Sequence, residues 1–379
     1  MDSIDLARLQ FATTTSFHFL FVLLTLGLVT MVTITQTRYA LRGHEVLGRM
    51  TRFWGRLYVV NYALGIVTGI VMEFQFGLNW SGLSTYAGDI FGAPLAIETL
   101  VAFFLESTFL GLWIFGWGRM NKWLHLATIW IVMLTAYASA FWIMAANSFL
   151  QNPVGYREEG GVLRLAEFGA LLTNPLFVNA LPHVLGAALL TGGVFVVGVS
   201  AHHFLRRSDE VDFFARSMRT GVVVSTAGAL VTVAFGVAQF PAVTRLQPDK
   251  LGTPATGSAL GFMIMIGYFY FFAAPFALLF LPRLRIARAR WLLRLMVWAI
   301  PLPFLAAILG WLVREIGRQP WLIYGKLTTA DAATSLDPVH VAVSFVAFLL
   351  LFAALAVADW TLLSRLARRG PEPSVTPGV

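Results

Sequence analysis

The 379-residue sequence contains no cysteine, and only 12% of its residues are charged. The absence of cysteine excludes disulfides, thiolate-bound iron–sulfur clusters and a covalently attached c-type haem in this chain. The low charge excludes an ordinary soluble domain, in which about a quarter of the residues are charged. Because 58% of the residues are hydrophobic, we predict an all-α, polytopic membrane protein.

Nine apolar runs are long enough to cross a bilayer. They lie near residues 14–36, 53–77, 94–117, 123–147, 177–202, 217–240, 259–282, 292–314 and 338–362. We expect residues 1–369 to form one transmembrane domain, and the Pro/Ser-rich residues 370–379 to form a disordered tail. Between the fourth and fifth runs, residues 148–176 are long enough for a short interfacial helix.

Positive charge is distributed unevenly between the two sides of these runs. Nineteen of the 27 Lys and Arg residues fall in the segments on one side. The positive-inside rule places that side in the cytoplasm, so we expect the N-terminus outside and the C-terminus in the cytoplasm. The net charge of +8 then reflects topology, and no nucleic-acid partner is expected.

Two carboxylates lie inside the third apolar run. Residues 88–107 read GDIFGAPLAIETLVAFFLES, in which a turn-like Gly/Asp/Pro segment precedes Glu98 and Glu106. The two are about 12 Å apart along a helix, and a carboxylate in hydrocarbon is costly unless it faces protein, water or a cofactor. They indicate a proton path or polar partners of a bound group, or else a pair of neutral, hydrogen-bonded structural acids.

Four residues of haem-ligand type fall near the expected outer ends of their spans: His18, His183, Met265 and Glu315. An electron-transfer haem takes two axial ligands such as His and Met, whereas a single ligand leaves the iron open to oxygen. These residues are therefore candidate ligands of haem iron.

Each candidate also has a simpler interpretation. A histidine at a span end is often an interfacial, hydrogen-bonded residue, and methionine is usually core filler. Glu315 lies between two arginines and is positioned for an ion pair, and Met72 and Met263 compete with Met265 as the methionine ligand. The interfacial interpretation is preferred for the remaining histidines, His44, His125, His202, His203 and His340.

Five long stretches resemble subunit I of the cytochrome bd-type oxygen reductases, which are membrane quinol oxidases. They are ARLQFATTTSFHFLFVLLTLG (7–27), FWGRLYVVNYALGIVTGIVMEFQFGLNW (53–80), GDIFGAPLAIETLVAFFLESTFLGLWIFGW (88–117), ANSFLQNPVG (146–155) and GWLVREIGRQPW (310–321). The resemblance implies that His18 and Glu315 are axial ligands of two high-spin haems, one b-type and one d-type or a second b-type, in an order left open. It implies that His183 and Met265 ligate a low-spin haem b.

The resemblance also assigns roles to polar residues. Glu98 and Glu106 match acids near the di-haem site, and Ser107 and Ser139 match positions on proton routes. The remaining matches lie near haem propionates or in matching motifs: Arg318, Arg8 and Trp311.

The sequence departs from this family on the side where electrons enter. The family's long quinol-binding loop between spans 6 and 7 is here the short, glutamate-free segment 241–258, in which Lys250 matches the loop's lysine and is a candidate donor-site residue. The family arginine two residues before the methionine ligand is Met263. These departures leave open whether quinol or another membrane donor supplies the electrons.

The resulting expectation is a terminal oxidase in a bacterial or archaeal cell membrane. It would reduce O2 to water with cytoplasmic protons, electrogenically but without pumping, beside a homologous subunit II and small single-span subunits. The alternative is a haem-bearing electron-transfer or sensing subunit that does not turn over O2 with quinol. A transporter is disfavoured because clear inverted repeats are absent.

Overall fold

The structure, a computed structural model, describes residues 2–281 and 289–372. Within these residues, nine helical segments are long and apolar enough to cross a membrane. This confirms the nine predicted spans. The segments are α1 (Ser3–Arg42), α2 (Glu45–Asn79), α3 to α4 (Ser81–Phe115), α5 (Lys122–Gln151), α7 (Pro175–Leu205), α8 to α9 (Val211–Leu246), α10 (Pro254–Leu278), α11 to α12 (Arg290–Ile316) and α14 (Pro338–Arg369).

Helix α1 shows why the helices are longer than their apolar runs. It starts at Ser3, where the Asp2 side chain caps the first turn by accepting from the Asp5 amide at 2.8 Å, and it ends at Gly43, whose φ of 68° is left-handed. Its 40 residues span about 60 Å, twice the thickness of a bilayer core. Helix α1 is therefore long enough to extend beyond the hydrocarbon, and its caps mark where it ends.

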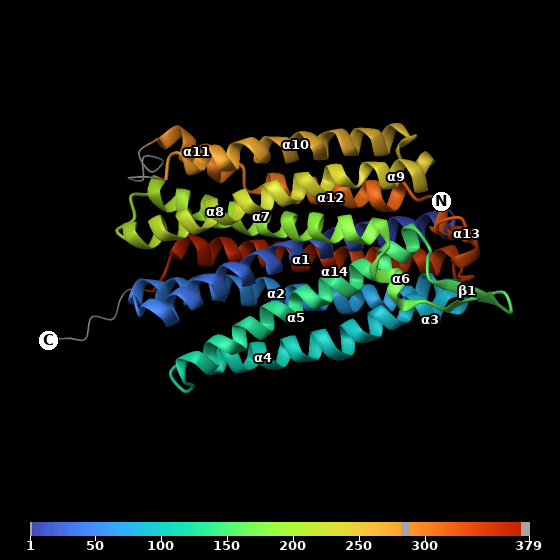
Figure 1. The fold of residues 1–379 in the computed structure, drawn as a ribbon, viewed down its shortest axis with the longest axis horizontal. Coiled ribbons are helices and arrows are strands. Elements are labelled where there is room, and N and C mark those ends of the chain that lie inside the picture. Colours follow the sequence, from blue (N-terminus) through green and yellow to red (C-terminus); the bar gives the residue numbers. More distant parts are fainter. Residues whose placement is uncertain (1, 282–288, 373–379) are drawn as a thin grey trace.

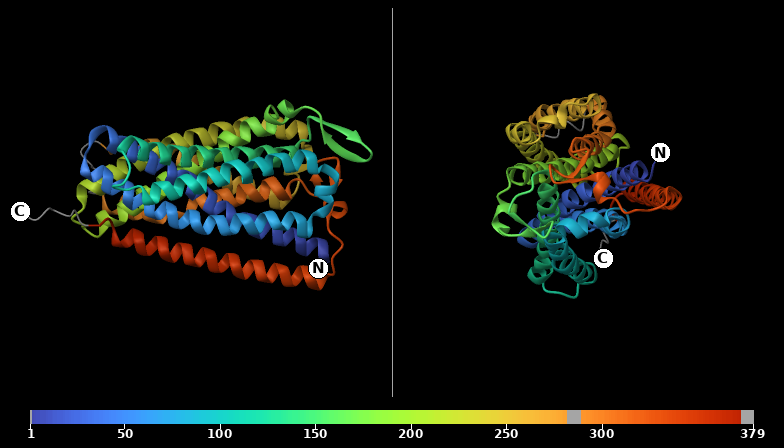
Figure 2. Two further views of the ribbon diagram at one scale, coloured as in Figure 1. Left: turned by 90° about the horizontal axis from the view of Figure 1, so that it is seen from below. Right: turned by 90° about the vertical axis from the view of Figure 1, so that its right-hand side faces the viewer.

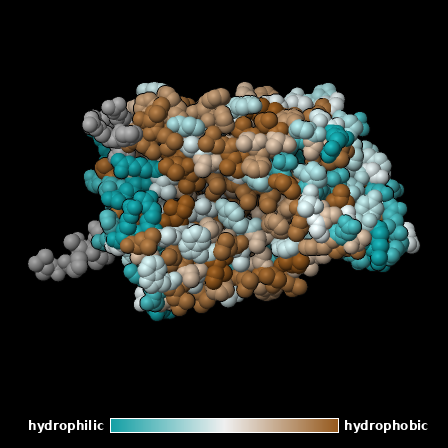
Figure 3. All heavy atoms as spheres, viewed as in Figure 1, coloured by the Kyte–Doolittle hydropathy of each residue, from teal (hydrophilic) through white to brown (hydrophobic). Residues whose placement is uncertain are grey.

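The helices run side by side along the long axis of the molecule (Figures 1 and 2). Helix α1 is central and packs against α2, α5, α7, α12 and α14. The start of α1 and the end of α14 lie at opposite ends of the bundle, as an odd number of spans requires (Figures 1 and 2). Figure 3 shows a hydrophobic belt between two hydrophilic ends, which is the surface expected of a protein that crosses a bilayer.

Three of the spans are interrupted. The third consists of α3 (Ser81–Ile97), the π-helical turn η1 (Glu98–Phe103) and α4 (Phe104–Phe115). The sixth divides into α8 (Val211–Ala238) and α9 (Phe240–Leu246), and the eighth into α11 (Arg290–Trp298) and α12 (Pro301–Ile316). The turn expected at 88–94 is corrected: the break lies at Ala87 (φ −138°, ψ 25°), and the helix continues through Pro94.

Small elements gather at the end of the bundle that carries the N-terminus (Figure 1). Segment 148–176 forms an antiparallel hairpin as well as the expected short helix, because Gly160 and Gly161 adopt positive φ at its turn. The elements here are β1 (Tyr156–Glu159), β2 (Val162–Leu165), α6 (Phe168–Leu172), the 3-10 turn η2 (Pro248–Leu251), β3 (Trp321–Ile323), β4 (Leu327–Thr328) and α13 (Thr329–Ala332).

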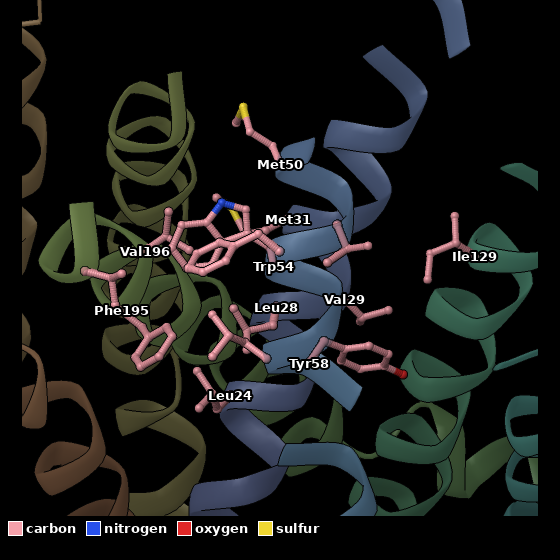
Figure 4. Close-up of a cluster of buried hydrophobic side chains, with 14 of the residues drawn as sticks. Leu24, Leu28, Val29, Met31, Met50, Trp54, Tyr58, Ile129, Phe195 and Val196 are labelled. Atoms are coloured by element: carbon pink, nitrogen blue, oxygen red, sulfur yellow. The ribbon is translucent and has the colours of Figure 1, made fainter. Parts of the chain in front are cut away.

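The largest hydrophobic cluster lies between α1, α2, α5 and α7 (Figure 4). Leu28 and Trp54 are almost fully buried in it. Near it, α1 and α7 cross at Gly27 and Gly192, where a Cβ added to Gly27 would lie 2.7 Å from the Gly192 Cα. The tail predicted at 370–379 falls largely outside the described residues.

Candidate functional site

His18 lies on α1 with its ring against α2. Its Nδ1 is 2.9 Å from Thr68 Oγ1, and the Thr68 hydroxyl donates its one hydrogen to the Gly65 carbonyl at 2.7 Å. Thr68 must therefore accept from His18 Nδ1–H, which leaves the Nε2 lone pair free. In metal-binding histidines, the ring nitrogen that does not bind the metal usually donates its hydrogen to a protein acceptor in this way.

His183 on α7 shows the same arrangement. Its Nδ1 donates to the Thr232 carbonyl on α8 at 2.7 Å. A Cβ added to Gly236 would lie 3.1 Å from Nδ1 and Cε1, so this edge of the ring faces α8 and Nε2 faces away. His183 lines a cavity of about 230 Å³ between α7, α8, α10 and α12.

Basic side chains line the end of this cavity nearest the N-terminal end of the bundle. Arg314 lines it and donates from Nε to Asn147 Oδ1. Lys250 on η2 is only 6% exposed, and its ammonium group donates to Gln151 Oε1, Gln247 Oε1 and the Arg314 carbonyl at 2.6, 2.9 and 3.1 Å. Burial, together with the nearby Arg314 guanidinium, lowers the pKa of Lys250 well below its ordinary value.

Glu315 is buried and ion-paired. Arg318 Nη2 donates to Oε2 at 2.6 Å, and Asn147 Nδ2 donates to Oε1 at 3.0 Å. Arg318 is 2% exposed, yet its Nε and Nη1 have no partner within the described residues, and neither does the buried Trp311 Nε1. Unpaired buried donors are costly, so this group of N–H donors suits the carboxylates of haem propionates.

Met265 is not where the sequence analysis expected it. It is 59% exposed on the outer surface, whereas Met263 lines the cavity beside His183. Because residues two apart lie on opposite sides of a helix, only one of these methionines can face inward. The structure therefore does not bring Met265 and His183 together.

Glu98 is joined to α5 and α2. Ser139 Oγ on α5 donates to Glu98 Oε1 at 2.6 Å. The Thr99 hydroxyl lies 3.3 Å from Glu98 Oε2 and 2.9 Å from Glu73 Oε1, between two carboxylates. Since Glu73 is about 9 Å from the end of α2, Glu98 lies close to the N-terminal end of the bundle, as expected.

Glu106 follows two turns later on α4 and is buried. The Tyr58 hydroxyl donates to Glu106 Oε1 at 3.4 Å, and Tyr62 OH lies 3.4 Å from Ser107 Oγ. Glu106 and Ser107 follow the π-helical turn η1, which begins at Glu98. Such turns often occur at functional sites.

Arg8 is not brought to the other candidates. It lies at the start of α1, partly exposed, and pairs with Asp5 at 3.8 Å. The sequence analysis in turn missed Thr68, Asn147 and Arg314. Their only signal was a polar side chain in an otherwise apolar helix.

The described residues, 2–281 and 289–372, contain no group of three His, Asp or Glu side chains that could hold a bare metal ion. His18 and His183 can each offer one ligand, the free Nε2, to a metal. Haem iron brings four nitrogen ligands of its own and needs only one or two from the protein. The single imidazoles of His18 and His183 thus suit the axial positions of haem iron.

Comparison with known proteins agrees with this chemistry. A family model described as cytochrome bd terminal oxidase subunit I matches residues 6–256 and 253–371. The chain belongs to the cytochrome bd terminal oxidase subunit I family. It is thus an oxidoreductase subunit of a haem-containing membrane oxidase. The two matched parts of the family model meet in the short connection between η2 and α10.

Relatives of known name cover nearly the whole chain. It is 37% identical to the cytochrome bd ubiquinol oxidase subunit 1 of Bacillus subtilis (strain 168), over 98% of this chain and 95% of that protein. It is 31% identical to the cytochrome bd-II ubiquinol oxidase subunit 1 of Escherichia coli (strain K12), over 98% and 97%. The fold matches the bd oxidase of Geobacillus thermodenitrificans with a TM-score of 0.90 and 24% identity, over 98% of this chain and 99% of that chain.

Proposed function

We propose that this chain is the haem-bearing subunit of a terminal oxidase that reduces O2 to water with electrons from quinol or another membrane donor. The observation that carries the proposal is the pair of half-buried histidines, His18 and His183, each with Nδ1–H fixed and Nε2 free. This arrangement is the one that metal-binding histidines usually have, which supports His18 and His183 as ligands of haem iron.

The residues of the site divide among three haems. His18 and Glu315 would ligate two high-spin haems, one b-type and one d-type or b-type, and His183 would ligate a low-spin haem b. Bound haem supplies the redox-active iron that the reaction requires. Arg318 and Trp311 would hold propionates with the N–H groups that lack partners in the described chain.

Protons would reach the site along side chains of the second to fourth spans. Glu106 and Glu98 can each accept and release a proton, with Tyr58 and Ser139 as hydrogen-bonding neighbours. If protons enter from the cytoplasmic side, their passage toward the outer half carries charge across the membrane, so turnover is electrogenic without a pump.

The hydrogen bonds of Lys250 support a structural role for this candidate donor-site residue. All three N–H bonds of its ammonium group are directed at acceptors within the protein. None remains for a quinol oxygen while this network is intact. Lys250 instead anchors the short connection over the His183 cavity, where an electron donor would approach.

The assembly expected for such a subunit includes a homologous membrane subunit II and small single-span subunits. The relatives named above are themselves called subunit 1. Both relatives come from bacteria, which supports a bacterial rather than an archaeal cell membrane as the location of the proposed complex.

Oxygen consumption by the purified complex tests the proposed function. We expect turnover with a reduced quinol, or with a reduced non-quinol donor such as a cytochrome, and a pyridine haemochrome spectrum that shows b-type haem. A complex that contains haem and is reduced by either donor, but consumes no oxygen, would overturn it.

A haem-bearing electron-transfer or sensing subunit is the second candidate. The observation that favours it is the short connection between α9 and α10, in which the family model breaks into two matches. Rapid reduction by a membrane partner without oxygen uptake would support this alternative.

A further inference from the structure

One face of α10 is a stripe of exposed apolar side chains. The exposed residues recur at intervals of three and four: Phe262, Met265, Phe269, Phe272 and Phe276. This spacing places them on a single side of the helix. Met265 therefore belongs to the outward face of α10, together with four phenylalanines.

The opposite face of α10 is buried and held in place. Ile266 and Tyr270 are buried, and the Tyr270 hydroxyl donates to the Ala299 carbonyl at 2.6 Å. A rotation of α10 that brought Met265 inward would break this hydrogen bond and move both buried side chains to the surface. The rotation of the helix is therefore fixed by contacts independent of either methionine.

Met263 faces the cavity that His183 lines from the other side. A Cβ added to Gly310 on α12 would lie 2.7 Å from Met263 Sδ, so the thioether occupies space that a side chain at Gly310 would fill. His183 keeps Nε2 free because Nδ1 is bound to the Thr232 carbonyl. An imidazole and a thioether, the ligand pair used by six-coordinate electron-transfer haems, thus line one cavity.

We propose that Met263, and not Met265, is the methionine that ligates the low-spin haem iron opposite His183. This inference rests on the proposed function, because it assumes a haem in the His183 cavity. It also explains why the position two residues before Met265 carries a thioether: the ligand has moved to the inward face of α10.

Two matched variants of the purified complex test the proposal: Met263→Leu and Met265→Leu. Each removes a thioether while nearly preserving volume. In Met263→Leu we expect the His/Met near-infrared magnetic circular dichroism band of the ferric complex to disappear and a new CO-binding haem to appear on reduction. Met265→Leu should retain the parent spectrum. Met263→His should stay low-spin with a bis-imidazole band and a lower midpoint potential, which guards against a variant that merely fails to fold.

The outcomes separate this inference from the proposed function. Loss of the His/Met band in Met265→Leu but not in Met263→Leu, or its retention in both, overturns the inference alone. A parent complex that contains haem without a low-spin His/Met band also overturns the inference alone. A parent complex without haem in the pyridine haemochrome assay overturns the proposed function.

Discussion

At the scale of single residues, the side chains that support His18 and His183 are as informative as the histidines themselves. Thr68 fixes the tautomer of His18 because its own hydrogen is committed to Gly65. Thr232 does the same for His183 through its backbone carbonyl. A threonine hydroxyl can be removed by mutation, whereas a backbone carbonyl cannot, so Thr68 is the position at which the arrangement can be tested.

Thr68→Ala should weaken haem retention about 10-fold or more, because loss of an outer-shell partner typically costs 10–100-fold in metal affinity. The haem-to-protein ratio after extended detergent washing measures the effect. Thr68→Ser restores the hydroxyl and should behave like the parent. Equal haem retention in Thr68→Ala and the parent would show that this hydrogen bond does not support a ligand.

Glu106→Gln should slow oxygen consumption by about 100-fold or more, since an amide cannot pass on a proton and positioned acid–base groups contribute about this much. Tyr58→Phe is the control, because it removes one long hydrogen bond of 3.4 Å and keeps the carboxyl group. We expect only a few-fold loss there. Turnover of Glu106→Gln within twofold of the parent, at equal haem content, would exclude Glu106 from proton transfer.

The pH dependence of the protein's stability should reveal the lowered pKa of Lys250. The pKa of Lys250 in the folded protein lies well below the ordinary 10.5. At pH values between the lowered pKa and 10.5, the unfolded chain therefore binds more protons than the folded protein does. Stability therefore rises with pH across this window, by up to about 1.4 kcal/mol per pH unit. Melting temperatures measured up to about pH 10.5 should rise less in Lys250→Met than in the parent.

Lys326→Met provides the control for that measurement. Lys326 lies on the β3–β4 hairpin and pairs with Glu158 at 2.6 Å, and this partner raises its pKa. The variant should keep the parent's rise in stability. The same slope in Lys250→Met and the parent would mean that Lys250 is not held at a lowered pKa.

At the scale of helices, the sequence was sufficient to locate the spans but not to orient them. Long apolar runs and loop charge predicted nine segments, because crossing hydrocarbon imposes length and composition. Which side of α10 faces the bundle depends on tertiary contacts such as Tyr270 with Ala299. The Phe262 to Phe276 stripe was the available signal, and its period, rather than its hydropathy, would have separated Met263 from Met265.

The close crossing of α1 and α7 at Gly27 can be tested by its effect on the stability of the protein. Gly27→Ala places a methyl group 2.4 Å from the Ala188 carbonyl oxygen and 2.7 Å from the Gly192 Cα, so α1 and α7 must move apart. Overpacking of this kind costs about 1–3 kcal/mol, measurable as a lower melting temperature in detergent. Gly111→Ala on α4, with no atoms within 4 Å, should be neutral or stabilising. Equal melting temperatures for Gly27→Ala and the parent would show that the helices cross less closely.

At the scale of the whole molecule, the two ends of the bundle differ in the elements and side chains that they contain. The end with the N-terminal helix start carries the β1–β2 hairpin and α13 (Figure 1). Lys250 on η2 and Arg314 near the end of α12 line the His183 cavity. The largest apolar cluster, centred between α1, α2, α5 and α7 (Figure 4), extends to Ala40 and Ala367 near the other end of the bundle. That the cytoplasm lies at the C-terminal end stays a prediction from loop charge.

Much of the site's residue list could be predicted from the sequence, but its geometry could not. His18, His183, Glu98 and Glu315 were found because charge and imidazole are rare in apolar helices. Their hydrogen-bond partners come from other helices, so only the packed bundle reveals them. Asn147, for example, lies 168 positions before Glu315 and donates to it at 3.0 Å.

A cryo-electron microscopy map of the purified complex tests the central claim most directly. The account predicts porphyrin density against the free Nε2 of both His18 and His183, with propionates beside Arg318 and Trp311. Density showing lipid or side chains in the His183 cavity, and no porphyrin at either histidine, would contradict it.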